Sequence, residues 1–248
     1  MRIPRIFQEQ SLAVGQSLIC DAQAVQYLLR VLRLKPGDAV TVFNGDGAEY
    51  AGKISALEKR EGCIQILQRH EVDLESPLRT VLVQGVSRGE RMDYTIQKAT
   101  ELGISEIFPV TTERTGVNLQ GERRERRRQH WQAIVTSACE QCGRNRVPLV
   151  HPVESLPSWV DRCQTLLQNE LKLVLHQNAA LSLRQMPRVF APGVVLLVGP
   201  EGGLTQSDLA AVSPLGFESV ALGPRILRTE TAALTALAIL QSLWGDLG

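Results

Sequence analysis

The chain has little net charge and few aromatic side chains. Its 248 residues carry 27 Lys and Arg against 26 Asp and Glu, and only 11 of them are Phe, Trp or Tyr. No global electrostatic field therefore attracts it to nucleic acid or membrane, and any polyanion must be held by local patches. No apolar run approaches the length of a membrane helix, and the start lacks the apolar segment of a secretory signal. We expect a cytoplasmic protein with no membrane partner.

Cysteine is also sparse. The five cysteines are odd in number and scattered, which argues against a disulfide scaffold in a chain of this size. Cys139 and Cys142 form a CxxC pair, but they fall near the end of a predicted helix, whereas a reactive thiolate is favoured at a helix N-terminus. No second Cys or His pair stands at zinc spacing. We predict reduced, buried thiols and no metal site.

Residues 1–75 predict a small β-barrel or sandwich. Short alternating apolar runs at 39–43, 48–54 and 63–67 lie between turn signals. One helix interrupts them, beginning at the N-cap Asp21, and its predicted apolar stripe comprises Val25, Leu28, Leu29 and Leu32. We expect this unit to end in the linker around Pro77.

Residues 76–248 predict an α/β domain. Strands and helices alternate there, as in a mostly parallel sheet covered by helices on both faces. The predicted strands are 80–86, 104–110, 171–176, 194–198 and 219–222, and the predicted helices are 92–102, 121–142, a short one capped by Thr205, and 230–244. Basic residues outnumber acidic ones 12 to 8 over 76–150, so an anion is expected to dock in that part.

The sequence Gly199-Pro200-Glu201-Gly202-Gly203 is the first candidate binding loop. It follows the buried-type strand 194–198 directly, and its glycines allow a sharp turn and a close approach of main chain to a ligand. Glu201 would suit a cationic ligand or a proton transfer. The alternative is a tight connection with a solvated Glu201.

A second candidate loop follows the predicted strand 219–222. Its two arginines, Arg225 and Arg228, flank the apolar pair Ile226 and Leu227, while Thr229 is placed to cap the last helix. The apolar pair would wall a flat pocket with the arginines at its mouth. A salt-bridged helix start is the alternative. The third contributor is Leu175-His176-Gln177 at another strand end, so three strand ends could converge on one crevice.

Arginines form a further group of candidate binding residues. The cluster Arg123, Arg124, Arg126, Arg127 and Arg128 lies on the polar side of a long helix, a pattern more typical of a solvated face than of a binding site. With so few aromatics, stacking would carry little of any RNA recognition, and phosphate contacts and shape would dominate. The arginines predicted to contact RNA are Arg2, Arg5, Arg30, Arg33, Arg88, Arg91, Arg114, Arg144 and Arg146.

The two late loops, in this order, resemble those of the SPOUT class of knotted S-adenosylmethionine-dependent RNA methyltransferases. With further motifs the whole chain resembles the RsmE family of 16S rRNA uridine N3-methyltransferases. Those motifs are Met1–Phe7, Val31–Asp38, Arg88–Gly103 and Ala138–Pro148. The chain departs from the family at Gln26-Tyr27, where members often carry a histidine pair.

The resemblance implies a PUA-like RNA-binding domain over 1–75 and a methyltransferase domain with a trefoil knot over 76–248. It also implies a homodimer acting on the assembled small ribosomal subunit. S-adenosyl-L-methionine would be held by Leu175, His176, Gly199, Pro200, Glu201, Gly202, Gly203, Leu222, Gly223, Ile226, Leu227 and Arg228. As catalytic residues we assign Arg228, which would stabilise charge on the uracil, and Glu201, which would take part in proton removal or attract the sulfonium.

Two other functions remain open from the residues. One is a non-enzymatic RNA-binding or ribosome-assembly factor that uses the same β domain and basic residues. The other is a phosphate-ester enzyme whose glycine-rich loop holds a nucleotide, although such chemistry normally needs a metal held by carboxylates. Binding of S-adenosylhomocysteine would separate the methyltransferase from both.

Overall fold

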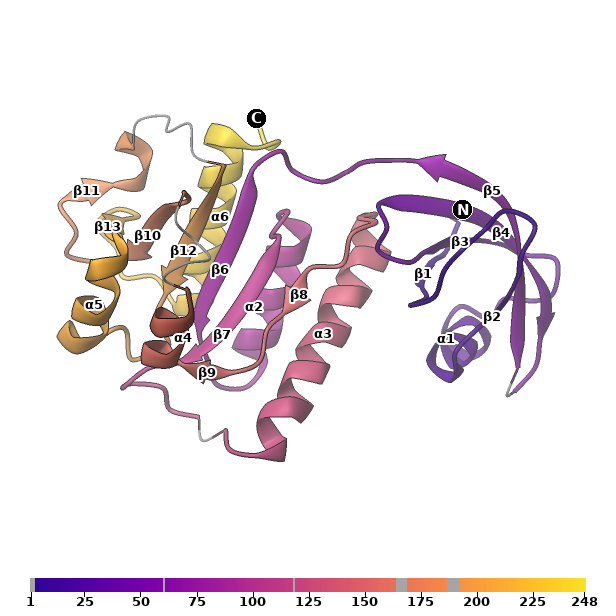
Figure 1. The fold of residues 1–248 in the computed structure, drawn as a ribbon, viewed down its shortest axis with the longest axis horizontal. Coiled ribbons are helices and arrows are strands. Elements are labelled where there is room, and N and C mark those ends of the chain that lie inside the picture. The colour runs from indigo at the N-terminus through magenta and orange to yellow at the C-terminus, as the bar shows by residue number, and fades with distance from the viewer. Residues whose placement is uncertain (1–2, 60, 118, 164–168, 187–191) are drawn as a thin grey trace. The chain divides into compact units, whose positions relative to one another are not determined.

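The computed structural model describes residues 3–59, 61–117, 119–163, 169–186 and 192–248 (Figure 1). Contacts divide the chain into two compact units, Met1–Glu75 with Thr136–Val147, and Ser76–Val135 with Pro148–Gly248. From the sequence, residues 136–147 were expected in the second domain. The structure differs because residues near the end of 1–75 bind this segment. Asn145 donates a hydrogen bond to the Val72 carbonyl at 2.8 Å, and Arg144 forms an ion pair with Glu75.

The first unit is built on a five-stranded sheet in the order β1-β3-β4-β5-β2. Its elements are β1 (Arg5–Phe7), β2 (Ser17–Ile19), α1 (Ala22–Gln26), the π-helix η1 (Tyr27–Val31), β3 (Ala39–Phe43), β4 (Ala48–Leu57) and β5 (Gly62–Glu71). β1 pairs with β3 in parallel, and the other neighbours are antiparallel. The register of β4 against β5 shifts twice, and such irregularities let a sheet bend around its core.

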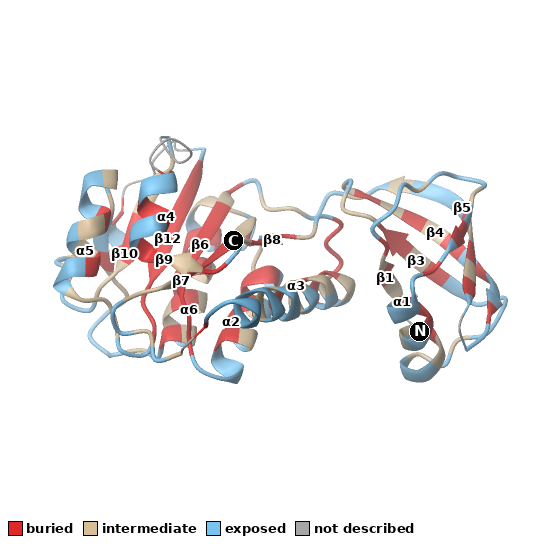
Figure 2. Ribbon diagram, turned by 60° about the horizontal axis from the view of Figure 1, so that its bottom comes forward, coloured by how far each residue is buried: buried red, intermediate tan, exposed pale blue. Residues whose placement is uncertain are grey.

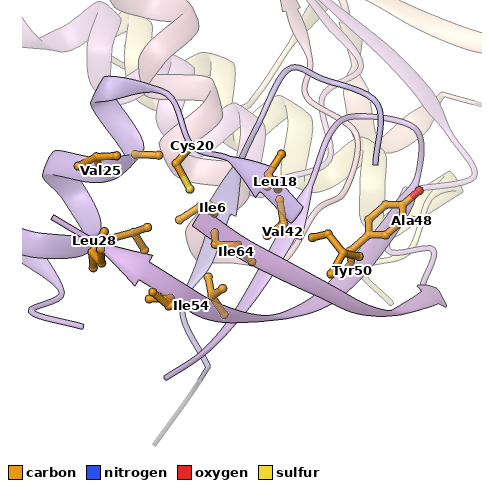
Figure 3. Close-up of a cluster of buried hydrophobic side chains, with 14 residues drawn as sticks. Ile6, Leu18, Cys20, Val25, Leu28, Val42, Ala48, Tyr50, Ile54 and Ile64 are labelled. Carbon is orange, nitrogen blue, oxygen red and sulfur yellow. The ribbon is translucent and has the colours of Figure 1, made fainter. Parts of the chain in front are cut away.

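The core of this unit lies between the curved sheet and the helical segment. Figure 3 shows Ile54 and Ile64 of the sheet with Val25 and Leu28 of the helical segment among its buried side chains. Asp21 caps α1 as predicted, accepting a hydrogen bond from the Ala24 N–H at 2.8 Å. The predicted continuous helix is wrong in one respect, because after Gln26 the chain winds as a π-helix rather than an α-helix.

The second unit contains an eight-stranded, wholly parallel sheet in the order β11-β13-β10-β12-β6-β7-β8, with β9 also on β7. Its strands are β6 (Arg79–Gly85), β7 (Glu106–Thr111), β8 (Leu149–Val150), β9 (Glu154–Ser155), β10 (Leu171–Leu175), β11 (Leu181–Ser182), β12 (Gly193–Val198) and β13 (Glu218–Ala221). The helical segments are α2 (Glu90–Glu101), α3 (Glu122–Cys142), which runs on into the residues grouped with the first unit, α4 (Leu156–Cys163), η2 (Leu183–Gln185), α5 (Gln206–Val212), η3 (Ser213–Leu215) and α6 (Thr229–Trp244).

Helices cover both faces of this sheet, which confirms the predicted α/β class (Figures 1 and 2). On one face α4 and α5 pack on the strands, with Trp159 and Val212 in a core that includes Val195 and Leu197 of β12. α2 and α6 cover the opposite face and pack against each other. Every residue of β12 is buried, which explains its continuous apolar sequence. Among the described residues, no helix has the length and apolarity needed to cross a membrane.

Charged residues meet at the start of the parallel strands. Glu106 at the start of β7 is hydrogen-bonded to His151 at 2.8 Å and ion-paired with Arg79 at 2.6 Å. Arg79 also pairs with Glu170 at 2.8 Å. The hydrogen bond with His151 has the largest effect on the Glu106 carboxyl, and the hydrogen bond and positive charge of Arg79 add to it. Together they outweigh the effect of burial and lower the pKa of Glu106 from 4.5 to about 2. Glu106 therefore stabilises the fold as a carboxylate.

We predict that Glu106→Gln lowers the free energy of unfolding at pH 7 by about 1 to 3 kcal/mol. Because folding lowers the pKa of Glu106, its contribution is fully present above pH 4.5 and is lost as the pH falls towards about 2. Urea denaturation between pH 7 and pH 3 should show the difference between wild type and variant shrinking below pH 4.5. Glu113→Gln, at an exposed position, is the control. A difference that is constant across this range would contradict the assignment.

Candidate functional site

Three adjacent parallel strands end at one edge of the second unit's sheet. β10 lies between β13 and β12 and is parallel to both, so their carboxyl ends, Leu175, Val198 and Ala221, lie at the same edge. Ligand crevices of open α/β sheets form at this edge. The segments that follow, 176–177, 199–203 and 222–228, are the ones singled out from the sequence, and the strand order brings them together.

A pocket of about 500 Å³ lies among these loops. Its volume is within the range of sites for small molecules and cofactors, which is about 300 to 1,000 Å³. All residues predicted to hold the cofactor line it: Leu175, His176, Gly199, Pro200, Glu201, Gly202, Gly203, Leu222, Gly223, Ile226, Leu227 and Arg228. The geometry therefore joins residues that lie more than fifty positions apart in the sequence.

Part of the pocket wall was not among the residues assigned to the cofactor from the sequence. Gln177, Arg225 and Thr229 were named with the candidate loops but not as cofactor contacts. The further lining residues are Val198, Leu204, Val220, Ala221 and Ala232, which lie close to the candidate loops in the sequence. Extending each candidate loop by one turn of chain would have found most of them. Arg91 and Arg114 also line the pocket, although they were predicted only as RNA contacts.

Glycine is required in this loop because main chains approach one another closely. A Cβ at Gly199 would lie 3.0 Å from the Gly203 carbonyl carbon, and one at Gly202 would lie 2.8 Å from Cβ of Arg114. From the neighbouring strand β6, a Cβ at Gly85 would lie 2.5 Å from the backbone nitrogen of Pro200. These glycines therefore allow the loop 199–203 to pack closely on itself, on β6 and on Arg114. This role is additional to the close approach of a ligand that the sequence predicts.

The carboxylate of Glu201 fastens the loop to a distant part of the chain. The Glu201 Oε1 accepts a hydrogen bond from the backbone N–H of Arg88 at 2.8 Å, and it forms an ion pair with the Arg91 guanidinium at 3.1 Å. Arg114 donates to the Gly202 carbonyl at 3.0 Å. Partial burial raises the pKa of Glu201, but the bonds from Arg88, from its own N–H and from Arg91 outweigh this and lower it overall. Glu201 is thus an anion with engaged partners and a weak base.

The predicted role of Thr229 as the cap of α6 is wrong. Arg228 occupies the N-cap position, and Thr229 is the first helical residue. The Thr229 hydroxyl donates instead to the Gly199 carbonyl at 2.6 Å, because α6 packs against β12 and its first residue lies next to the end of that strand. Arg228 and Arg225 both line the pocket, and within the described part of the chain neither guanidinium has a hydrogen-bonding partner.

The arginines predicted to contact RNA fall into two groups. Arg5 and Arg144 have side chains that are 8% and 6% exposed and pair with Glu49 and Glu75, so neither is presented to a phosphate. We therefore remove these two from the predicted RNA-facing set. The more accessible members are Arg30, Arg33, Arg88, Arg91, Arg114 and Arg146. Arg2 lies outside the described residues.

The predicted inertness of two thiols agrees with their surroundings. Burial raises the pKa of Cys20 and of Cys139 to about 12, so neither is a thiolate near neutral pH. Cys139, the first cysteine of the CxxC pair, has its sulfur 3.6 Å from the Arg146 carbonyl. All five cysteines are free.

A glycine-lined pocket at the carboxyl edge of a parallel sheet is typical of enzymes that bind a small molecule or cofactor. Comparisons with known proteins define the class further. Residues 74–241 match the model of the RNA methyltransferase domain, and residues 19–67 match the model of the RNA methyltransferase PUA domain. The chain therefore belongs to the RNA methyltransferase family with an N-terminal PUA domain, and it is an enzyme of that class.

Several relatives of this chain carry the name ribosomal RNA small subunit methyltransferase E. The protein of that name from Buchnera aphidicola (Schizaphis graminum) is 35% identical, with 99% of this chain and 98% of the relative covered. The protein from Mycobacterium bovis is 32% identical, with 93% and 89% covered. The Neisseria gonorrhoeae protein of that name is 40% identical in sequence over the whole of both chains. Its crystal structure, with S-adenosyl methionine bound, matches this structure with a TM-score of 0.91.

Proposed function

We propose that this enzyme uses S-adenosyl-L-methionine to methylate N3 of a uridine in 16S ribosomal RNA, acting on the assembled small subunit in the cytoplasm. The observation that carries the proposal is the pocket, which gathers every loop residue predicted for the cofactor at one edge of the sheet. The names of the relatives and the cofactor in the Neisseria protein support it. The uridine position itself rests on the family resemblance.

The residues of the pocket fit this cofactor. Two glycines, Gly203 and Gly223, have open space where a side chain would lie and so leave main chain accessible. Ile226 and Leu227 offer an apolar wall for a flat ring system. The volume of about 500 Å³ accommodates a nucleoside with an amino-acid tail. We assign cofactor binding to the twelve predicted residues that line the pocket. When bound, the cofactor supplies a methyl group activated by a positively charged sulfur.

The protein must align a uracil nitrogen with that methyl group and exclude water. Uracil N3 carries a proton and is a poor nucleophile until the proton leaves, so the negative charge that spreads onto the flanking carbonyl oxygens needs stabilisation. Arg228 is suited to this role because its guanidinium lies at the pocket and has no partner among the described residues. The base must also be unstacked or flipped to reach the pocket.

Glu201 is better suited to positioning the loop than to accepting the proton. Its carboxylate already receives bonds from Arg88 and Arg91, and its lowered pKa makes it a weak base. We therefore narrow the role predicted from the sequence: Glu201 orients Gly199–Gly203 and adds negative charge near a positively charged ligand. Proton removal from uracil is then left to a group other than Glu201.

We propose a homodimer in which α6 contributes to the interface. This helix is apolar around most of its circumference, and Leu234 and Ile239 are only partly covered while Leu243 is 41% exposed. A helix that is apolar on all sides is normally buried. A second copy of the chain, as the family resemblance implies, would cover this face.

The proposed reaction is tested by mass spectrometry of rRNA nucleosides from a strain lacking the gene, before and after addition of the purified protein and S-adenosylmethionine. We expect 3-methyluridine to appear in small-subunit rRNA, with assembled subunits modified more efficiently than naked rRNA. A methyl group on another base or another uracil atom would overturn the proposed position. Absence of any cofactor-dependent methylation would overturn the proposed reaction.

The role of Glu201 predicts a specific kinetic pattern for Glu201→Gln. The amide oxygen keeps an acceptor for Arg88, but the charge that pairs with Arg91 is removed, so the KM for the cofactor should rise about three- to tenfold while kcat stays within about twofold. Removal of a general base would instead reduce kcat by about 100-fold or more. Glu113→Gln is the exposed control. A large fall in kcat at saturating cofactor would restore Glu201 as proton acceptor.

The RNA-facing set predicts how binding responds to salt. Replacing Arg30 and Arg146 with Ala should weaken binding to small-subunit rRNA and reduce the slope of log affinity against log salt by about 0.7 to 0.9 for each phosphate that the variant no longer neutralises. The control is Arg69→Ala, since Arg69 pairs with Glu71 and lies outside the set. Filter binding over a range of salt concentrations measures the slope. A slope equal to that of wild type would place the RNA elsewhere.

A further inference from the structure

A buried polar relay lies at the wall of the pocket. The Thr229 hydroxyl donates to the Gly199 carbonyl at 2.6 Å and accepts a bond from the Gln84 side-chain amide at 3.0 Å. The same amide nitrogen donates to the Gly85 carbonyl at 3.0 Å. Gln84 is fully buried and Thr229 is only 7% exposed, so these bonds are made away from bulk solvent. We call Gln84, Thr229 and the Gly199 carbonyl the threonine relay.

The chemistry of the groups gives the relay a direction. The Gly85 carbonyl can only accept, so the amide of Gln84 must turn its nitrogen towards it. The second hydrogen of that nitrogen then points to Thr229, whose oxygen accepts it. The single hydroxyl proton of Thr229 is thereby left for the Gly199 carbonyl. Gln84 thus orients the hydroxyl, and the hydroxyl in turn fixes the carbonyl.

The relay connects three elements that meet at the pocket. Gln84 and Gly85 end β6, Gly199 begins the loop after β12, and Thr229 begins α6 directly after the loop 222–228. Both Gly199 and Thr229 line the pocket. The close approach of Gly85 to Pro200 seats the start of the glycine loop on β6. A buried carbonyl needs a partner, so removal of the hydroxyl would favour a shifted loop.

We propose that Thr229 and Gln84 are positioning residues for cofactor binding. Thr229 acts through the Gly199 carbonyl, and Gln84 acts through Thr229, so that loop 199–203 and the start of α6 are held in the conformation that receives S-adenosylmethionine. This inference rests on the proposed function, which assigns the pocket to that cofactor. The relay takes no part in methyl or proton transfer, and its effect is on affinity.

The test is calorimetric titration of the full-length protein with S-adenosylhomocysteine. Thr229→Val keeps the shape but removes the hydroxyl, and it should raise the Kd about tenfold, the size of one net hydrogen bond. Thr229→Ser keeps the hydroxyl and should bind within about twofold of wild type. Gln84→Met should raise the Kd about threefold, and the double variant should match Thr229→Val, because Gln84 acts through Thr229.

Thr100→Val is the matched control. Thr100 is a buried threonine of α2 that donates to the Ile96 carbonyl at 2.9 Å and does not line the pocket. Its replacement should lower the Tm without changing the Kd. A Thr229→Val protein with wild-type affinity would overturn the inference and leave the proposed function standing. If Thr229→Val does not fold, an unchanged Kd for Gln84→Met overturns it. Wild-type protein that does not bind the ligand would overturn the proposed function itself, and this inference with it.

Discussion

The parallel pairing of β10 with β12 and β13 is the constraint on which the site depends. Side-by-side parallel strands expose their carboxyl ends at one edge, and the loops that follow must begin there. Residues from 175, 199 and 222 onward therefore share a pocket although long stretches of chain separate them. The apolar sequence of β12, which is buried along its whole length, fixes this strand in the interior of the sheet.

Close main-chain packing then determines the shape of the loops. Gly85 and Gly202 each lie where a Cβ would overlap a neighbouring atom. The Thr229 hydroxyl holds the start of the same loop at Gly199, and the Glu201 carboxylate holds its middle. The loop is thus held by contacts with β6, with the start of α6, and with the segment around Arg88. Such preorganisation lowers the cost of binding a flexible ligand.

Much of this organisation could be predicted from the sequence. Alternation of apolar residues located β3, β4 and β5, continuous apolar runs located β10 and β12, and Thr205 marked the start of a helix. The short strands β1 and β2 were missed because three residues carry too little periodicity. Resemblance to a known family added the cofactor and the substrate class, which periodicity does not contain, and its implied trefoil knot stays a prediction.

Side-chain partners were the least predictable part of the site. Arg5 and Arg144 were predicted from the sequence to contact RNA, yet each forms an ion pair with a carboxylate that is distant along the chain. Thr229 was predicted to cap a helix, yet the packing of α6 against β12 places the Gly199 carbonyl within reach of its hydroxyl. Pairings of this kind depend on tertiary contacts and leave no local pattern.

A crystal structure of the protein with S-adenosylhomocysteine tests the central claim most directly. We expect density for the ligand at the carboxyl ends of β10, β12 and β13, in contact with the main chain of 199–203 and 222–228. Density at another surface, or these loops closed over a filled pocket in the presence of saturating ligand, would contradict the claim.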